Sequence, residues 1–382
     1  MRIEEGSPAL TGALVDMDLD TPALVIDAQK LEQNILGMAD VAESQGVVLR
    51  PHVKTHKIPS IARRQTETGA VGITVAKVSE AEVMADGGLD DIFVAYPLVT
   101  EAKIRRAIGL AKRRLRLILG VDSRHGAHKL SSLARDEGIT LEVRLEVDSG
   151  LGRTGVPRAE AAGLAQEISS LENLDLTGVY TYRGAVLEDG SPTTDLEEAG
   201  RLEGEFMVSV AEEIRDAGVP VEDVSLGSTP TAKPAAGVEG VTEIRPGTYV
   251  FYDRMQATLG TCSLSDCALR VMATVASRPR PDLVIIDGGS KTFATDVQPK
   301  TAPLNLAGFG YVVGHPTAVL ERVTEEHGML SVDKDSDLRV GDTVEIIPNH
   351  VCSTVNLHDE VYVLAADGST EKVRVAARGM VR

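Results

Sequence analysis

The sequence predicts an α/β protein built from a (β/α)8 barrel followed by a β-rich C-terminal domain. From about residue 23 to residue 250, short apolar runs alternate with amphipathic stretches, a pattern typical of repeated β/α units around a parallel sheet. Beyond residue 255 the helical periodicity mostly disappears, and glycine, proline and aspartate turns separate the apolar runs. A chain of 382 residues is long enough for a barrel and a second, smaller domain.

Nine strands are expected in the first part of the chain. They are Ala23–Asp27, Val47–Val53, Gly72–Ala76, Ile92–Ala95, Leu115–Leu119, Leu141–Val147, Gly178–Tyr182, Val224–Leu226 and Glu243–Arg245. Because eight strands close this type of barrel, one of the nine belongs elsewhere. Ser79, with Glu82 three residues later, predicts a capping box at the start of a helix. In the second part, Leu283–Ile286, Val344–Ile347 and Val361–Leu364 are the clearest strands.

The charge balance narrows the choice of partners. With 57 acidic and 39 basic residues the net charge is −18, which repels phosphate and excludes nucleic acid or an anionic membrane as a partner. The chain has no apolar run of about eighteen residues and no basic-then-apolar start. Three cysteines cannot form a disulfide framework, and the spacing of Cys262 and Cys267 matches no common zinc motif. We therefore expect a cytoplasmic protein.

The first candidate site residue is a lysine that follows an apolar run. Barrel enzymes carry their reactive groups at the C-terminal ends of the strands. The segment Arg50–Lys57, which reads RPHVKTHK, directly follows Val47-Val48-Leu49. A half-buried lysine among other cations has a lowered pKa, and its neutral amine can condense with an aldehyde. Lys54 is therefore a candidate nucleophile, although the segment alone fits a basic surface loop better.

Glycine-rich polar turns close several later strands. They are Asp148–Gly155, Tyr180–Gly184, Gly227–Thr229 and Arg245–Tyr249. The last two follow the expected seventh and eighth barrel strands, where barrels commonly bind phosphate through backbone N–H groups and hydroxyls. The sequence therefore predicts a cofactor that carries a phosphate.

A candidate metal pair lies near the end of the chain, in the segment Pro348–Asp359. In a β-strand, residues i and i+2 point to the same face, so His350 and Cys352 can bind one metal ion together. A thiolate beside an imidazole favours Zn²⁺. Two protein ligands leave coordination positions for water or substrate. The spacing alone also fits a hydrogen-bonded histidine and a buried cysteine without a metal.

Taken in order, these residues resemble the D-threonine aldolase and D-serine dehydratase family, part of the alanine-racemase-like group of pyridoxal phosphate (PLP) enzymes. The resemblance covers essentially the whole chain. Its most specific parts are RPHVKTHK and HVCSTVNLHD, supported by Arg245–Tyr249 and Asp287–Lys291. It implies an N-terminal segment, residues 1–26, that packs with the β domain, a PLP-binding barrel at 27–254 and the β domain at 255–382. The strand Ala23–Asp27 would then precede the barrel.

The resemblance also assigns roles to residues. Lys54 would carry PLP as a Schiff base, and Tyr180 or Tyr182 would lie beside the cofactor ring, with Arg153 as a further contact. The phosphate would be held by Gly227, Ser228, Thr229, Gly247, Thr248 and Tyr249. His350 and Cys352 match the family's metal pair, which would hold Zn²⁺ or Mn²⁺. Enzymes of this group usually form head-to-tail homodimers, so the same is expected here.

The expected activity is retro-aldol cleavage of a small D-β-hydroxy-amino acid such as D-threonine, with His52 or His56 as candidate bases. The His350-x-Cys352 spacing is typical of the dehydratases, whereas aldolases of the family often have His-x-Asp. Conversely, dehydratases tend to place a histidine near Tyr182-Arg183-Gly184. Dehydration of D-serine or D-3-hydroxyaspartate to a 2-oxo acid and ammonia is therefore the main alternative. Racemisation, a PLP carrier without catalysis and a sugar or phosphate-ester enzyme without PLP are weaker alternatives.

Overall fold

The computed structural model describes residues 19–382, which fold into two compact units. The barrel unit consists of Leu36–Lys54, Ile58–Gly247 and Met380–Arg382. The β unit consists of the described residues up to Ile35 together with Thr55–Lys57 and Thr248–Gly379. The expected domain boundaries at residues 26 and 254 remain a prediction, and most of the expected N-terminal segment lies outside the described residues.

The barrel unit contains an eight-stranded sheet in which every paired strand is parallel. Its strands are β2 (Val48–Leu49), β3 (Ile73–Val75), β4 (Asp91–Val94), β5 (Arg116–Val121), β6 (Leu141–Glu146), β7 (Leu174–Tyr180), β8 (Asp223–Leu226) and β9 (Glu243–Ile244). The sheet order runs from β2 through β9 and β8 down to β3. A parallel bridge between His52 and Thr74 joins the two end strands, so the sheet closes into the predicted barrel.

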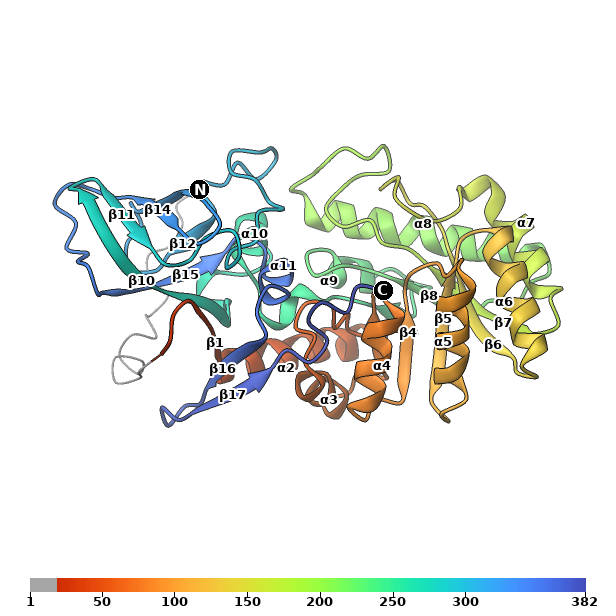
Figure 1. Cartoon of the computed structure of the whole chain (residues 1–382). Coiled ribbons are helices and arrows are strands. Elements are labelled where there is room, and N and C mark those ends of the chain that lie inside the picture. Colours follow the sequence, from red (N-terminus) through yellow and green to blue (C-terminus); the bar gives the residue numbers. More distant parts are fainter. Residues whose placement is uncertain (1–18) are drawn as a thin grey trace. The chain divides into compact units, whose positions relative to one another are not determined.

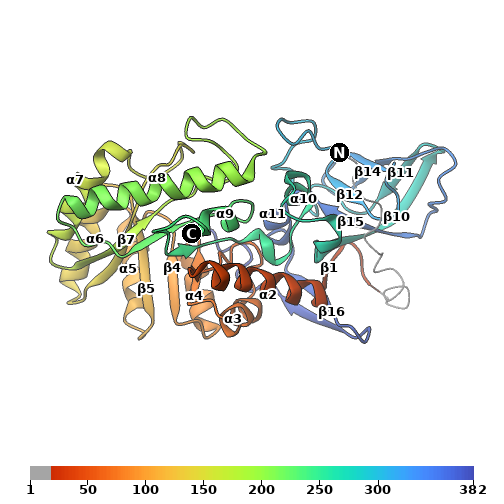
Figure 2. The same cartoon turned by 180° about the vertical axis from the view of Figure 1, so that it is seen from behind.

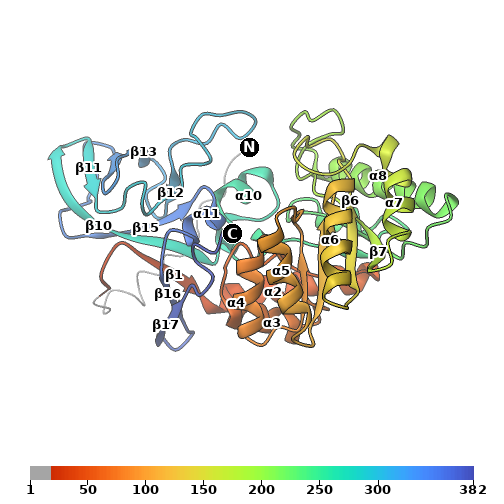
Figure 3. The same cartoon turned by 45° about the vertical axis from the view of Figure 1, so that its right-hand side comes forward.

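Amphipathic helices cover the outside of the barrel, because each has one apolar face (Figure 1). They are α2 (Ala28–Gln45), α3 (Pro59–Glu67), α4 (Val78–Asp86), α5 (Glu101–Ala111), α6 (Arg124–Asp136), α7 (Arg158–Ser169), α8 (Leu196–Asp216) and α9 (Ala232–Ala236). In α5, Ile104, Ala107 and Ile108 recur at helical spacing and are buried. Helices α4, α5 and α6 lie side by side (Figure 3), and α8 packs on β7 and β8 (Figure 2).

The predicted capping box is wrong. Helix α4 begins at Val78, so Ser79 lies inside its first turn, and the N-cap residue Lys77 makes no side-chain cap. The Ser79 hydroxyl instead donates a hydrogen bond of 2.6 Å to the main-chain oxygen of Arg382. The local pattern therefore placed the helix correctly but not its first residue.

The β unit is built around a nine-stranded sheet in the order β11-β14-β13-β12-β15-β10-β1-β16-β17. The bounds are β1 (Ala23–Asp27), β10 (Leu269–Arg280), β11 (Leu283–Ile286), β12 (Gly310–Val312), β13 (Val319–Val323), β14 (Gly328–Ser331), β15 (Thr343–Pro348), β16 (Glu360–Leu364) and β17 (Thr370–Arg374). Two short helices, α10 (Arg254–Leu259) and α11 (Val351–Val355), accompany it. Strand β1 pairs with β10 and β16, which confirms that Ala23–Asp27 is not a barrel strand.

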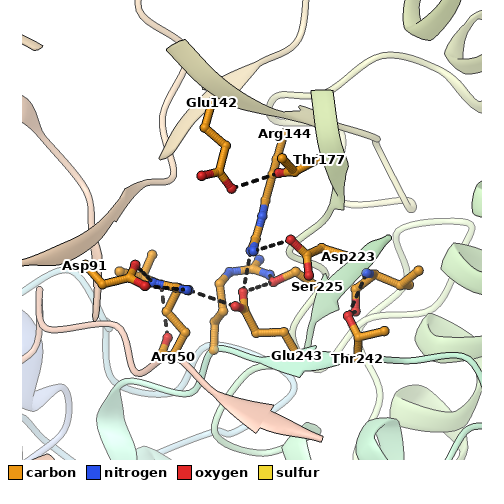
Figure 4. Close-up of polar contacts among 12 residues, drawn as sticks. Arg50, Asp91, Glu142, Arg144, Thr177, Asp223, Ser225, Thr242 and Glu243 are labelled. Carbon is orange, nitrogen blue, oxygen red and sulfur yellow. Dashed lines mark hydrogen bonds and ion pairs between the residues drawn. The ribbon is translucent and has the colours of Figure 1, made fainter. Parts of the chain in front are cut away.

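Charged side chains fill part of the barrel interior, where aliphatic layers are usual (Figure 4). Glu243, which is 1% exposed, accepts hydrogen bonds from Arg50 Nε at 2.7 Å and Arg144 Nη1 at 2.5 Å. Arg144 also donates to Asp223 at 2.7 Å, and the Ser225 hydroxyl donates to Glu243 at 2.5 Å. Burial alone would raise the pKa of Glu243, but Arg144 and Arg50 lower it to about 2. The network is therefore ionised at neutral pH.

Within residues 19–382, the helices are all too short or too polar to cross a membrane.

The substitution Glu243→Gln should lower the free energy of unfolding by about 3–5 kcal/mol at pH 7, because it leaves Arg50 and Arg144 buried without their shared carboxylate. The folded-state pKa of Glu243 is about 2, below the ordinary 4.5, so the stabilisation is present above pH 4.5 and is lost as the pH falls toward 2. Urea unfolding followed by circular dichroism should show the difference between wild type and variant shrinking below pH 4.5. Glu205→Gln, at an exposed ion pair on α8, should cost less than about 1 kcal/mol.

Candidate active site

Lys54 lies at the C-terminal end of the barrel strands. Beyond β2 the chain continues beside β3, and the Val53 N–H donates to the Thr74 carbonyl at 2.9 Å. The Lys54 Nζ is 5.4 Å from the centre of the Tyr182 ring, and the Arg153 guanidinium carbon is 5.0 Å from the same ring. The structure thus brings together three of the predicted residues, Lys54, Arg153 and Tyr182.

The two candidate tyrosines have different surroundings. Tyr182 is 38% exposed, whereas Tyr180 is 1% exposed and donates a hydrogen bond of 3.0 Å to Glu146 Oε2. Burial and the neighbouring Glu146 raise the pKa of Tyr180 well above its ordinary value. Tyr182 is therefore the tyrosine whose ring is open to a ligand, and Tyr180 belongs to the barrel interior.

Glu146 is a buried acid that the sequence analysis did not single out. It is the last residue of β6, and it accepts hydrogen bonds from Tyr180 and from the Thr154 hydroxyl at 2.7 Å. Burial raises the pKa of its carboxyl group, although both hydrogen bonds oppose the shift. The signal in the sequence was a charged residue inside the apolar run Leu141–Val147.

The predicted phosphate turns after β8 and β9 lie together. The Gly247 N–H donates to the Thr229 hydroxyl oxygen at 3.3 Å. The Ser228 N–H donates to the Thr231 hydroxyl oxygen at 3.1 Å. Gly227 has φ +81°, a left-handed conformation that favours glycine. Thr248 and Tyr249 follow in the β unit, where they begin a short 3-10 helix.

Glu203 in α8 holds the first of these turns in place. Its fully buried carboxylate accepts the Thr231 hydroxyl at 3.2 Å and the Arg183 N–H at 2.9 Å. Burial raises the pKa of Glu203. The Arg183 guanidinium packs over the Phe206 ring, and its nitrogens have no hydrogen-bond partner among the described residues. Glu203 therefore ties the end of β7 to the turn after β8.

The predicted strand geometry of the metal pair is wrong, although the two side chains do meet. Residues Val351–Val355 form helix α11, with His350 at its N-cap position. The chain turns into this helix because the buried Asp253 carboxylate accepts the Val351 N–H at 3.0 Å. The side chains of His350 and Cys352 lie close enough to shift each other's pKa.

Each side chain of this pair shifts the pKa of the other. Burial lowers the pKa of His350, but the Cys352 thiolate and the Asp296 carboxylate outweigh burial and raise it to about 11. Burial raises the pKa of Cys352, and the neighbouring His350 outweighs it, so the thiol pKa is lowered. A deprotonated thiol is the form that binds a metal ion.

Other side chains surround the pair. The Thr55 hydroxyl lies 3.1 Å from Cys352 Sγ and the Thr248 hydroxyl lies 3.5 Å from it. His350 Nδ1 lies 2.5 Å from Asp296 Oδ2. Among residues 19–382 no cluster of three or more histidine, cysteine, aspartate or glutamate side chains is placed to hold a metal ion. An adjacent imidazole and thiol nevertheless fit one divalent cation that completes its shell with water or substrate.

The two candidate bases also differ. The ring Nδ1 of His52 accepts a 3.4 Å hydrogen bond from the Lys54 N–H, and the residue is partly exposed. His56 is fully buried and lies edge-on to Phe251, with ring centres 6.5 Å apart. The geometry therefore favours His52 over His56 as a group that can reach a substrate.

Comparison with known proteins identifies the family of the chain. The family model for the alanine racemase N-terminal domain matches residues 26–255, and that for a putative serine dehydratase domain matches 268–364. A D-threo-3-hydroxyaspartate dehydratase from Delftia sp. is 35% identical over 375 residues, covering 93% of this chain and 97% of the relative. A D-threonine aldolase from Arthrobacter sp. is 32% identical over 370 residues, covering 95% and 94%.

A solved structure extends the comparison to the fold. A cysteine-to-alanine mutant of a D-threo-3-hydroxyaspartate dehydratase in the metal-free form matches with a TM-score of 0.87 at 33% identity. The match covers 94% of this chain and 97% of that one. The chain has a closed parallel barrel with a lysine at its mouth, and it has a separate β unit. These are the features of an alanine-racemase-like PLP enzyme. The chain belongs to the D-threonine aldolase and D-serine dehydratase family, and its predicted class, a PLP-dependent lyase, is confirmed.

The substitution Glu203→Ala should weaken PLP binding by about tenfold, because the loss of two buried hydrogen bonds frees the turn that carries Ser228 and Thr229. Titration of the cofactor-free protein with PLP, followed by absorbance, measures the dissociation constant. Glu212→Ala, at an exposed position of the same helix, is the matched control. Equal affinities for the two variants would contradict the role of Glu203.

Proposed function

We propose that this enzyme cleaves D-threonine and related D-β-hydroxy-amino acids to glycine and an aldehyde. The observation that carries the proposal is that the chain supplies two kinds of functional group. In the barrel unit, Lys54 and Arg153 both lie beside the Tyr182 ring, and in the β unit His350 and Cys352 form the candidate metal pair. A lysine that can hold PLP and a metal pair suit a substrate that has both an amino group and a β-hydroxyl. The D-threonine aldolase among the relatives supports this choice.

Each residue of the barrel site would have a separate role in the reaction. Lys54 would bind PLP, and the turns at Gly227–Thr229 and Gly247–Tyr249 would hold its phosphate. When bound, PLP supplies an electron sink for the charge left at Cα. Tyr182 and Arg153 would orient the bound ring, because the Lys54 amine and the Arg153 guanidinium both lie beside the Tyr182 ring. His52 is our candidate for the base that takes the proton of the β-hydroxyl.

The metal pair would act on the same hydroxyl. His350 and Cys352 would hold a divalent cation, which lowers the pKa of a bound hydroxyl and so favours its deprotonation. A thiolate ligand favours Zn²⁺, with Mn²⁺ as the second candidate. The metal-free cysteine mutant among the related structures supports a metal site of this kind.

Dehydration is the second candidate function. It is favoured by the cysteine at position 352 and by the D-threo-3-hydroxyaspartate dehydratase among the relatives. In that reaction the Lys54 amine removes the proton at Cα and the β-hydroxyl leaves as water. D-Serine would then give pyruvate and ammonia. The two activities differ in which bond at Cα is broken.

Product analysis separates the two functions. Purified protein incubated with D-threonine should release glycine and acetaldehyde faster than it releases ammonia from D-serine or D-3-hydroxyaspartate. Lys54→Ala should abolish activity and the cofactor absorbance at about 410–430 nm, whereas Lys334→Ala, at an exposed position of the β unit, should keep both. Formation of a 2-oxo acid and ammonia alone would establish the dehydratase. An unchanged absorbance band in Lys54→Ala would refute the assignment of Lys54.

Removal of the metal should also stop the reaction. Dialysis against a chelator should lower the rate of D-threonine cleavage by at least about tenfold, because the β-hydroxyl then loses the cation that lowers its pKa. Zn²⁺ and Mn²⁺ added back separately then show which ion restores the rate. Full cleavage activity after chelation, with metal content confirmed as zero, would contradict the proposed role of His350 and Cys352.

We further propose that the protein works in the cytoplasm as a head-to-tail homodimer whose only other partner is the small D-amino acid. The odd number of cysteines and the acidic composition support the location and the absence of nucleic acid. Light scattering of the purified protein should give twice the mass of one chain.

A further inference from the structure

We infer that Asp296 is a positioning residue of the metal centre, holding the His350 ring with Nδ1 occupied so that Nε2 is the nitrogen that binds the cation. The inference rests on the metal site of the proposed function. It adds a residue that neither the sequence motif nor the comparisons assign.

Asp296 contacts the His350 ring directly, and a second hydrogen bond from Ser353 holds the Asp296 carboxylate. His350 Nδ1 lies 2.5 Å from Asp296 Oδ2, and the Ser353 hydroxyl donates to the same carboxylate oxygen at 3.0 Å. Asp296 lies in the connection between β11 and β12, 54 residues before His350 in the chain. Ser353 lies in helix α11 together with Cys352. The carboxylate thus holds both the histidine and the helix that carries the cysteine.

The chemistry of imidazole explains why this contact matters. A neutral imidazole has one N–H and one lone pair, and its two tautomers exchange which nitrogen can bind a metal. A carboxylate that accepts the Nδ1–H fixes the tautomer, so the lone pair stays on Nε2, and it also makes that nitrogen more basic. The second ligand is fixed independently, since the hydroxyls of Thr55 and Thr248 contact Cys352 Sγ.

The other nearby acid has a different task. Asp253 accepts the backbone N–H groups of Val351 and Gln256, so it holds the starts of α11 and α10 rather than the imidazole ring. Among the described residues, Asp296 is the carboxylate whose hydrogen bond to the His350 ring is seen. Because only two protein side chains would bind the ion, the orientation of each contributes strongly to the affinity.

The test compares metal affinities of metal-free proteins. Wild type, Asp296→Ala, Asp296→Asn and a control are titrated with Zn²⁺ and, separately, with Co²⁺. The control is Asp337→Ala, which removes an exposed carboxylate 4.0 Å from the Nδ1 atom of another histidine, His315, in the same unit. Asp296→Ala should raise the dissociation constant about 10- to 100-fold. Asp296→Asn should raise it less, because the amide oxygen still accepts the Nδ1–H, and Asp337→Ala should leave it unchanged.

Co²⁺ adds a spectroscopic readout that does not depend on activity. A thiolate bound to Co²⁺ gives a charge-transfer absorbance, and this band should persist in both Asp296 variants at saturating metal, because Cys352 keeps its own contacts. Retained PLP absorbance in each variant shows that the protein is folded.

Three results would count against the inference or its basis. Zn²⁺ affinities of both Asp296 variants within twofold of wild type would overturn the role of Asp296 while leaving the metal centre intact. An equal loss of affinity in Asp337→Ala would show that the effect is general electrostatics and would also overturn it. Wild-type protein that binds neither ion would instead overturn the metal centre in the proposed function.

Discussion

The carboxylate of Glu243, shared by Arg50 and Arg144, is the interaction on which the barrel depends. Strands β2 and β9 have only two residues each, so backbone hydrogen bonds alone hold them weakly to their neighbours. The network adds side-chain links from these strands to β6 and β8 across the interior (Figure 4). Because a buried charge without its partners is costly, a strand arrangement that separated Glu243 from Arg50 or Arg144 would be disfavoured. A barrel closed in this way can leave its other end to polar, functional side chains.

Buried acids organise the end of the barrel that carries Lys54. Glu203 fixes the turn after β8 through Thr231, and Glu146 holds Tyr180 inside the barrel, so that Tyr182 is the ring beside Lys54. Each of these acids pairs with a residue at the end of another strand or helix. The loops that carry the chemistry are thereby held by a rigid scaffold rather than by their own contacts.

The sequence was sufficient for elements whose signal is local. The strands Ala23–Asp27 and Leu283–Ile286 are found with the predicted bounds, because each is an apolar run between polar residues. The sequence did not predict contacts between residues that lie far apart in the chain. Helix α11 forms where a strand was expected because Asp253, 98 residues earlier, accepts the Val351 N–H. Glu203 and Asp296 act on residues 28 and 54 positions away, and no spacing rule connects such pairs.

Aldol cleavage and dehydration place different demands on the same residues. Dehydration needs a base at Cα, and the Lys54 amine can fill that role. Cleavage needs a base at the β-hydroxyl, and His52 is the partly exposed histidine closest to Lys54 in the chain. Its Nδ1 accepts the Lys54 N–H, so in the neutral ring Nε2 carries the proton and Nδ1 is the basic nitrogen. A cation held by His350 and Cys352 would serve either reaction, since it would make the β-hydroxyl both a better acid and a better leaving group. The choice between the two activities would therefore depend on which bond at Cα is held perpendicular to the cofactor ring. Tyr182, beside Lys54, and Arg153, over the Tyr182 ring, are our candidates for the side chains that set it.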